Sequence, residues 1–546
     1  TAAMAAINKT EDAGKTTPAH ALETGAVDQV LDDTQPPLPM RDNDNFYAAL
    51  VRSRADDVDR VCLETESGET YTFADLDRLS AQYAHALLAL GCARDDRVAV
   101  QVEKSAHALA LFLACLRAGL IYLPLNTAYQ RAELSHFLAD AQPKVFVCAQ
   151  SAVESMRSFA RSLDIPRVEG MDASGGGSLT QLAAAKPHSF ATVYRSADDI
   201  ATIMYTSGTT GRSKGAMISH RAAYFCADGL AKHWGFKPHD VLLHALPIFH
   251  AHGLFISSCV ALISGGTLLF HRKFDLDATL QALPRVTAMM AVPTFYHRLL
   301  SDDRLTADLC SHIRLFTSGS AALSAQVHQA FVDRVGHPIL ERYGATETMI
   351  LTSNPLHGER RPGSVGMPLP GVELRIAGED DMPLPKGKIG MIQVRGPGLF
   401  SGYWQLPEKT AEAFSADGFF RTGDLGSESE DGYVTITGRA KDMIISGGYN
   451  VYPAEIEGYI NEMPGVAESA VVGVPHPDFG EGVIAVVVAK PGAAVDADAV
   501  VGALKGKIAN FKVPKRVFVV TDLPRNAMGK VQKNLLRQAH AKLFAA

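Results

Sequence analysis

Hydrophobic and polar positions follow two different periods along the chain from about Asn45 onward. Short runs rich in β-branched residues predict buried strands, and stretches with the period of an amphipathic helix lie between them. Alternation of this kind favours an α/β fold built of layered, largely parallel sheets. The expected strands span residues 97–102, 144–149, 199–205, 240–246, 286–292 and 313–317, and helices are expected at 220–233 and 324–335.

The pattern changes after about Gly371, where short strand-like pieces are separated by Gly, Pro and Asp turns. This texture predicts a β-rich subdomain that closes the large unit. Its expected strands lie near residues 373–376, 391–394 and 433–437.

A third region begins beyond Arg439, and its length suits a small second domain. We therefore expect an N-terminal domain over residues 41–439 and an α+β C-terminal domain over residues 440–546. The C-terminal elements expected from the pattern are a turn-rich segment, a helix at 453–463, strands at 468–474 and 482–489, and a final helix.

Residues 1–40 differ from the rest, because they are rich in Ala, Thr, Pro and Asp and have little periodicity. They lack the apolar core of a signal peptide, and their acidic residues argue against a transit peptide. We interpret them as a disordered leader and expect a cytoplasmic protein.

Bulk composition narrows the class of protein further. A chain of 546 residues is too long for one hydrophobic core, and 47% hydrophobic with 20% charged residues is typical of a globular enzyme. The net charge of −7 without a long basic block argues against a nucleic-acid partner, and no apolar run is long enough for a membrane span. Seven scattered cysteines without a Cys-x-x-Cys pair predict buried thiols rather than disulfides or a zinc site.

The segment 205–215, Tyr-Thr-Ser-Gly-Thr-Thr-Gly-Arg-Ser-Lys-Gly, directly follows an apolar strand. Glycines let backbone N–H groups approach a phosphate closely, and hydroxyls and a lysine add donors, so the segment suits a triphosphate. A flexible polar loop is the alternative. A Walker-type loop is excluded because Arg212 follows Gly211. The candidate donors are Thr206, Ser207, Gly208, Thr209, Thr210, Gly211, Ser213, Lys214 and Gly215.

This segment resembles the signature of the acyl-adenylate-forming superfamily, which contains acyl-CoA synthetases, luciferases and peptide-synthetase adenylation domains. The resemblance runs from about Asn45 to the C-terminus and implies a large domain, a small mobile domain, and the use of ATP, Mg²⁺ and coenzyme A. Further matching segments follow in the family's order, at residues 246–250, 318–321, 341–348, 421–425, 438–442, 447–453 and 524–530.

The resemblance implies a role for individual residues at the nucleotide. Lys530 would bridge the carboxylate and the α-phosphate during adenylation, and Glu347 with Thr206 would bind magnesium. Without the resemblance, a lone lysine or glutamate would be a solvated charge, and Tyr343 a core aromatic. The remaining implied ATP-binding residues are Tyr343 on the adenine with Ser320 and Ala321 beside it, Asp424 on the ribose, Arg439 at the ribose or phosphates, and Ser207, Gly208, Thr209, Thr210, Gly211, Lys214, Glu341, Arg342, Gly344 and Thr346.

The resemblance also places a hinge at Lys441, about which the small domain would turn between an adenylating and a thioester-forming pose. In the second pose Gly447, Gly448 and Tyr449 would line the channel for the CoA thiol. A simple turn is the alternative for Gly447. The Gly-flanked Lys530, expected to be exposed, suggests regulation by acylation.

The expected acyl pocket is lined by residues 249–253, 292–298 and the neighbourhood of Gly344. Relatives that activate acetate or propionate carry a Trp where this chain has Gly344. Buried charge needs an opposite charge, so a basic lining points to a second carboxylate on the substrate. The candidate residues are His250, which we also expect to be catalytic, His252, Ser320, Ala345, and Arg298, expected at the start of a helix after a buried strand.

Over nearly its whole length the chain is similar to malonyl-CoA synthetases, including residues 122–127 and 245–253. Ala345 departs from the Met common in those relatives and would admit methylmalonate. We therefore expect a monomeric or homodimeric CoA ligase that makes malonyl-CoA from malonate, CoA and MgATP through malonyl-AMP, releasing AMP and pyrophosphate. Alternatives are a CoA ligase for another short dicarboxylic, short-chain or aryl acid, an adenylation enzyme that loads a separate carrier protein, a luciferase-like oxidase, and a non-catalytic nucleotide-binding regulator.

Overall fold

The computed structural model describes residues 43–52, 57–206 and 213–545, and the leader expected at residues 1–40 lies outside them. The largest sheet has nine strands, and its central strands are parallel, as the sequence predicts. Its strands, in spatial order, are β15 (Met367–Pro368), β14 (Met349–Ser353), β13 (Leu340–Ala345), β12 (Leu315–Ser318), β11 (Ala288–Ala291), β9 (Val241–His244), β10 (Thr267–Phe270), β1 (Val61–Thr65) and β2 (Thr70–Thr72).

A second α/β sheet has six strands and ends in the antiparallel pair β7–β8. All six strands expected in the first part of the chain are confirmed in one or other of the two sheets, with ends shifted by one or two residues. The strands of the second sheet, in spatial order, are β6 (Arg167–Gly170), β5 (Val145–Cys148), β3 (Arg97–Gln101), β4 (Ile121–Pro124), β7 (Ile200–Thr206) and β8 (Lys214–Ser219).

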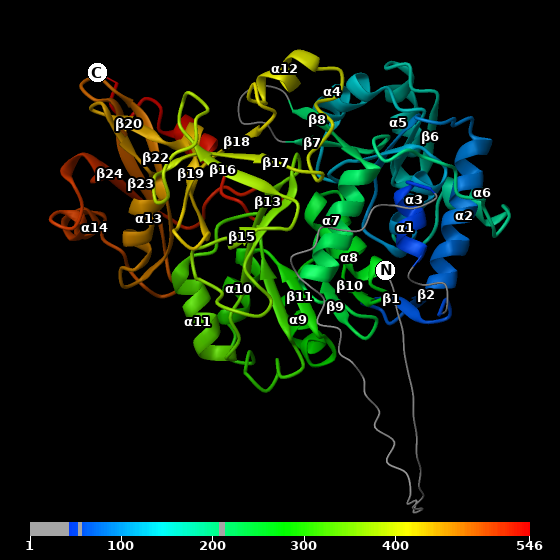
Figure 1. Ribbon diagram of the computed structural model, residues 1–546, viewed down its shortest axis with the longest axis horizontal. Coiled ribbons are helices and arrows are strands. Elements are labelled where there is room, and N and C mark those ends of the chain that lie inside the picture. Colours follow the sequence, from blue (N-terminus) through cyan, green and yellow to red (C-terminus); the bar gives the residue numbers. More distant parts are fainter. Residues whose placement is uncertain (1–42, 53–56, 207–212, 546) are drawn as a thin grey trace, which may run out of the picture.

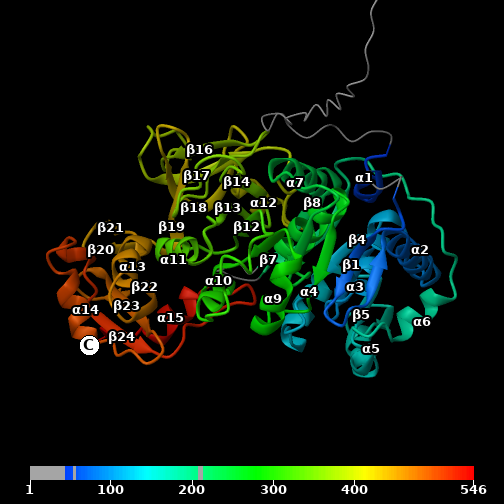
Figure 2. The ribbon, with the colours of Figure 1, turned by 90° about the horizontal axis from the view of Figure 1, so that it is seen from below.

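Helices pack between and around these two sheets (Figures 1 and 2). The helix α3 is buried along almost its whole length, because it joins the core cluster shared by α1, α2, α7 and α8. The expected helix at 220–233 is confirmed as α7. The bounds are α1 (Phe46–Arg52), α2 (Phe73–Ala89), α3 (Ala106–Arg117), α4 (Arg131–Ala141), α5 (Val153–Arg161), α6 (Ser178–Ala184), α7 (His220–His233), a π-helix (His252–Ser258), α8 (Cys259–Ile263), α9 (Leu276–Ala282), α10 (Pro293–Leu300), α11 (Ala325–Val335) and α12 (Pro407–Glu412).

The expected β-rich region and the C-terminal α+β region form two further sheets. Figure 1 shows the C-terminal strands and helices, coloured orange to red, at the end of the molecule opposite to the six-stranded sheet. The first sheet contains β16 (Glu373–Ala377), β17 (Gly390–Arg395), β18 (Phe420–Glu428) and β19 (Val434–Arg439). The second contains β21 (Tyr449–Val451), β20 (Ile444–Ser446), β23 (Gly480–Ala489), β22 (Val466–His476) and β24 (Arg516–Val520), with α13 (Pro453–Asn461), α14 (Ala497–Leu504) and α15 (Lys533–Ala539).

The C-terminal region is docked onto the nine-stranded sheet through the loop that precedes α15. Met528 is buried in a cluster with Leu246 and Val292. The backbone of Gly529 approaches α10 so closely that a Cβ added there would lie 2.8 Å from the hydroxyl oxygen of Thr294. The loop therefore lies at the carboxyl ends of β9 and β11, which is where open α/β sheets bind ligands.

All seven cysteine side chains are buried, as the sequence predicts. Within residues 43–52, 57–206 and 213–545, none of the helices has the length and apolar character needed to cross a membrane.

Candidate active site

The hairpin β7–β8 holds the ends of the expected phosphate loop. Thr206 pairs with Lys214 across the hairpin, and the hydroxyl of Tyr205 donates to Asp140 at 2.5 Å. His136 of α4 faces the carbonyl of Ser213 at 2.9 Å. The two flanks of the loop are thus fixed to α4. The loop residues expected to contact phosphates, Ser207, Gly208, Thr209, Thr210 and Gly211, lie outside the described residues.

Tyr403 joins this hairpin to Glu347. Its hydroxyl donates to Oε1 of Glu347 at 3.1 Å, and the Lys214 ammonium lies 4.3 Å from the centre of its ring. Burial and the nearby Glu347 carboxylate raise the pKa of Tyr403. Sequence reasoning missed this residue. The position of Tyr403 depends on a contact that the sequence pattern does not reveal: the segment Gly402–Trp404 pairs with β8 like a short additional strand.

Tyr343, Asp424 and Arg439 form a bonded group that we call the Asp424 cluster. The Tyr343 hydroxyl donates to Oδ2 of Asp424 at 2.5 Å, and Nε of Arg439 lies 2.9 Å from Oδ1. Burial and Asp424 raise the pKa of Tyr343 far above its ordinary value. Three residues from β13, β18 and β19 therefore meet, and both oxygens of the carboxylate have partners within the protein. Their expected roles at the nucleotide stay predictions.

Lys530 reaches the Asp424 cluster from the C-terminal loop. Its loop is closed by Asn526, whose Oδ1 accepts from the backbone N–H of Lys530 at 3.0 Å. Burial and the positive charge of Arg439 lower the pKa of Lys530. The expectation of an exposed Lys530 was wrong in this pose, because the side chain is partly buried against the large domain. The acylation hypothesis loses the exposure on which it rested.

Lys441 lies in a single 3-10 turn, Ala440–Asp442, directly after Arg439. The residue as a whole is exposed, but its ammonium is partly desolvated. This desolvation, with the positive charges of Arg439 and Lys530, lowers the pKa of Lys441 to about 8 against the opposing effect of Asp442. The neighbouring Asp442 forms an ion pair with Arg537 of α15 at 2.8 Å. The expected hinge therefore lies at the junction of the two regions, and its motion stays a prediction.

A second group, which we call the Arg342 cluster, consists of His250, His252, Ser320 and Arg342. His252 begins the π-helix, is buried, and has its Nδ1 at 3.0 Å from the Ser320 hydroxyl. Ser320 adopts a left-handed backbone with φ of 69°, a conformation that non-glycine residues tolerate mainly at functional sites. Nε2 of His252 is buried and has no hydrogen-bond partner among the described residues.

Arg342, which the resemblance implies at the nucleotide, instead lies buried close to these histidines. Its guanidinium packs on Gly319, where an added Cβ would lie 2.2 Å from the guanidinium carbon. Its Nε and Nη2 are buried and have no hydrogen-bond partner in the described part of the chain. Burial lowers the pKa of Arg342 to about 10, and burial together with Arg342 lowers the pKa of His250 to about 4. The cluster therefore contains buried donors that have no partner among the described residues.

Arg298 and Glu341, two predicted site residues, lie in surroundings that differ from those expected for the acid and nucleotide sites. Arg298 lies in the last turn of α10, because the helix already begins at Pro293, so its expected position at the helix start was wrong. It is exposed, with its guanidinium carbon 4.7 Å from the centre of the Phe274 ring. The carboxylate of Glu341 is buried, accepts from the N–H of Gly363 at 3.1 Å and faces His328 at 3.2 Å. These contacts within the protein give Glu341 a structural role.

The remaining predicted residues are placed by local backbone geometry. Gly447 and Gly448 form the two-residue turn between β20 and β21, with φ of 59° and 82°, which favours glycine at both positions. Tyr449 follows them, is 59% exposed, and stacks on Phe511 at 4.6 Å. The turn therefore has a structural reason for its glycines besides the expected contact with CoA. Ala321, Gly344, Ala345 and Thr346 are partly exposed on the loops beside Ser320 and Tyr343.

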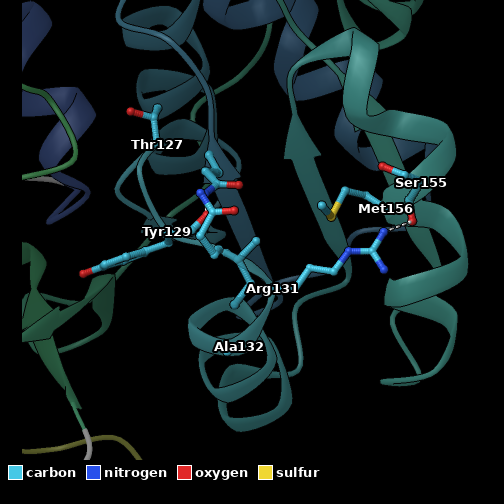
Figure 3. Close-up of a pocket in the computed structure, with 9 residues that line it drawn as sticks. Thr127, Tyr129, Arg131, Ala132, Ser155 and Met156 are labelled. Carbon is cyan, nitrogen blue, oxygen red and sulfur yellow. Dashed lines mark hydrogen bonds between the residues drawn. The ribbon is translucent and has the colours of Figure 1, made fainter.

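A separate hollow of about 590 Å³ lies between α4 and α5, beyond the carboxyl ends of β3 and β4. Figure 3 shows Arg131 extended across it toward α5, where its guanidinium donates to the carbonyl of Ser155 at 3.3 Å. Its lining contains none of the predicted site residues.

Comparisons with known proteins identify the family of the chain. An AMP-binding enzyme family model matches residues 50–404, and an AMP-binding enzyme C-terminal domain model matches residues 455–530. The chain therefore belongs to the AMP-binding enzyme family, the acyl-adenylate-forming enzymes whose signature its sequence carries. Within that family it groups with the adenylate-forming CoA ligases, a class that uses ATP and coenzyme A.

Three relatives illustrate the range of the likeness. The indoleacetate–CoA ligase of Aromatoleum aromaticum is 37% identical, over 86% of this chain and 93% of its own length. The mitochondrial malonate–CoA ligase of Mus musculus is 33% identical, over 92% of this chain and 93% of its own. The solved structure of ATP-bound MatB from Rhodopseudomonas palustris is 51% identical with a TM-score of 0.90, over 92% of this chain and 100% of that one.

Proposed function

We propose that this enzyme makes malonyl-CoA from malonate, CoA and MgATP through malonyl-AMP, with release of pyrophosphate and AMP. The observation that carries the proposal is the Arg342 cluster: among the residues that the structure describes, two nitrogens of the buried arginine and one of His252 have no hydrogen-bond partner. A buried donor without a partner costs about 1–3 kcal/mol, more when it is charged. An anionic group on the substrate would remove that cost.

Malonate has such a group in its second carboxylate. The planar fork of arginine binds a carboxylate with two parallel hydrogen bonds, a geometry that a neutral substituent cannot supply. Acetate would leave the nitrogens of Arg342 unpaired, and an aryl acid would bring apolar surface against them. Discrimination of this kind reaches several powers of ten where a site is built to hydrogen-bond one substrate group. Malonate–CoA ligases among the relatives, and MatB among the solved structures, support the same assignment.

In the adenylation step the residues of this chain position the reactants and stabilise charge. Lys530 would lie between the reacting carboxylate and the α-phosphate, since its loop is docked beside the Asp424 cluster. Asp424 would accept from the ribose while Tyr343 and Arg439 hold its carboxylate in place. Tyr343 would then support the adenine.

Glu347 and Thr206 suit a magnesium ion that is shared with the triphosphate. Magnesium is bound through one or two carboxylates plus phosphate oxygens and water, and Glu347 supplies one carboxylate, oriented by Tyr403. When bound, the ion would neutralise charge on the phosphates. Thr206 lies at the end of β7, at the entry to the phosphate loop.

The thioester step would use a second pose of the C-terminal region, residues 440–546, turned about Lys441. Lys530 would leave the site, and the turn of Gly447 and Gly448 with Tyr449 would approach it for the CoA thiol. In the present pose that turn is exposed. One active site would thus serve two half-reactions.

The test is pyrophosphate release with a panel of acids, each with CoA. The panel contains malonate, methylmalonate, succinate, acetate, sulfoacetate, indoleacetate and ferulate. We expect the highest kcat/KM with malonate, followed by methylmalonate, because Ala345 leaves room near the acid. Sulfoacetate should follow, because a tetrahedral sulfonate fits the arginine fork less well than a planar carboxylate. A higher kcat/KM with indoleacetate or ferulate would contradict the proposal.

A further inference from the structure

Lys104 is a buried cation that joins the two α/β sheets. It lies between β3 of the six-stranded sheet and α3, and it is 7% exposed. Its ammonium donates to the end of β9 in the nine-stranded sheet. The three acceptors are Nδ1 of His244 at 2.9 Å, the carbonyl of His244 at 2.9 Å and the carbonyl of Leu246 at 2.8 Å. These bonds use all three donors of one lysine.

The bonds of His244 determine which of its nitrogens carries the proton. Its Nε2 lies 2.8 Å from the carbonyl of Gly253 and 2.9 Å from the hydroxyl of Ser258. The Ser258 hydroxyl itself donates to the Gly253 carbonyl at 2.7 Å, so its oxygen accepts from His244. A carbonyl only accepts, and therefore Nε2 carries the proton and Nδ1 is the acceptor for Lys104.

The carbonyl of Gly253, which accepts from His244 and Ser258, belongs to the first turn of the π-helix. A π-helix is rare and marks functional positions, and here it starts at His252, whose side chain joins the Arg342 cluster. The preceding segment folds back so tightly that a Cβ on Gly253 would lie 2.0 Å from the carbonyl oxygen of Pro247. The N–H of His252 also donates to Nδ1 of His250 at 3.2 Å. A displacement of Gly253 would therefore move both histidines.

We propose that Lys104 is a positioning residue for the acid substrate: through His244 it fixes the carbonyl of Gly253, and thereby the π-helical turn that carries His252 into the Arg342 cluster. This inference rests on the proposed function only in taking the Arg342 cluster as the acid site. Burial lowers the pKa of Lys104, and the nearby Glu66 opposes that effect. The face of Phe270, 4.3 Å from the ammonium, also favours the charged form.

The test compares Lys104→Met with Arg117→Met in the full-length enzyme. Arg117 is a matched control, because it is a buried cation at the other end of α3 that bonds the carbonyls of Asp77 and Phe190. Both variants should lower the melting temperature. Only Lys104→Met should raise the KM for the preferred acid, by about tenfold, since small displacements of binding groups are costly, and leave the KM for ATP within twofold. An unchanged acid KM in Lys104→Met, or an equal rise for acid and ATP, would overturn the inference.

A double-mutant cycle separates positioning from a general loss of packing. If Lys104 acts through His244, the variant Lys104→Met with His244→Gln should raise the acid KM no more than the larger single effect. Additive effects would contradict the inference. The cycle uses the acid that the substrate panel selects, so a failure of the malonate proposal leaves it intact.

The wild-type protein provides a test that does not depend on folding of a variant. Nitrogen NMR of histidine-labelled enzyme should find His244 neutral, with the proton on Nε2. A proton on Nδ1, or a charged imidazolium, would overturn the inference.

Discussion

The Asp424 cluster and the Arg342 cluster meet at β13 and differ in one physical respect. In the first, both carboxylate oxygens of Asp424 have partners within the protein. In the second, Nε and Nη2 of Arg342 and Nε2 of His252 are buried without a partner among the described residues. Tyr343 and Arg342 are consecutive on β13, and each side chain joins a different cluster.

We infer that the two clusters have different tasks, although both contain residues of the segments that match the family. A cluster whose bonds are satisfied within the protein keeps its geometry without ligand, which suits binding of the same nucleotide in every member. A cluster with unpaired donors is completed only by a ligand of matching charge, which suits selection of the acid. The variants below test that division, beginning with the largest expected effect.

Lys530→Ala should reduce malonate-dependent pyrophosphate release by about 10²–10³-fold, as expected for removal of a group that stabilises developing charge. Thioester formation from supplied malonyl-AMP should stay largely intact, because Lys530 would leave the site in the proposed second pose. Rapid-quench assays of the two half-reactions measure both quantities. Equal loss in both would contradict the two-pose account.

Asp424→Asn should weaken the nucleotide side alone. It removes a carboxylate that Arg439 and Tyr343 hold and that would accept from the ribose in the proposed role. Charged hydrogen bonds contribute about 1.5–3 kcal/mol, which corresponds to a rise of at least about tenfold in the KM for ATP. The KM for malonate should change less than threefold. Initial-rate titrations of each substrate check this, and a larger rise for malonate than for ATP would remove the division between the clusters.

Arg298→Met should have the smallest effect. In this pose the side chain is exposed over Phe274, and exposed cation–π contacts contribute about 0.5–1 kcal/mol. We expect the KM for malonate, measured by initial-rate titration, to rise less than about fivefold. A rise of a hundredfold would restore Arg298 as the principal arginine for the acid and displace Arg342.

The sequence predicted the fold well where hydrophobic periodicity was regular. The strands β3 and β7 and the helix α7 were predicted to within two residues because each is a continuous buried or amphipathic run. The position of Arg298 was predicted less well. The helix was expected to start near Arg298, whereas proline at the first helical position begins α10 at Pro293.

The nucleotide residues were predicted by resemblance, and the structure brings Tyr343, Asp424 and Arg439 together. The surroundings of Arg342 were not predictable, because they depend on the close approach of Gly319, which lies in the loop between β12 and α11. Tyr403 was missed for a similar reason. Its contact with Glu347 forms only when the segment after β17 pairs with β8.

The central claim is that Arg342 receives the second carboxylate of the substrate, and one ratio tests it most directly. The kcat/KM for malonate divided by that for propionate, which lacks the second carboxylate, is measured in wild type, Arg342→Met and Gly319→Ala, with Gly458→Ala as the control glycine in open surroundings. Arg342→Met and Gly319→Ala should lower the ratio by about a hundredfold or more, because the charged partner is lost or displaced, and the control should leave it unchanged. An equal loss for malonate and propionate would contradict the account.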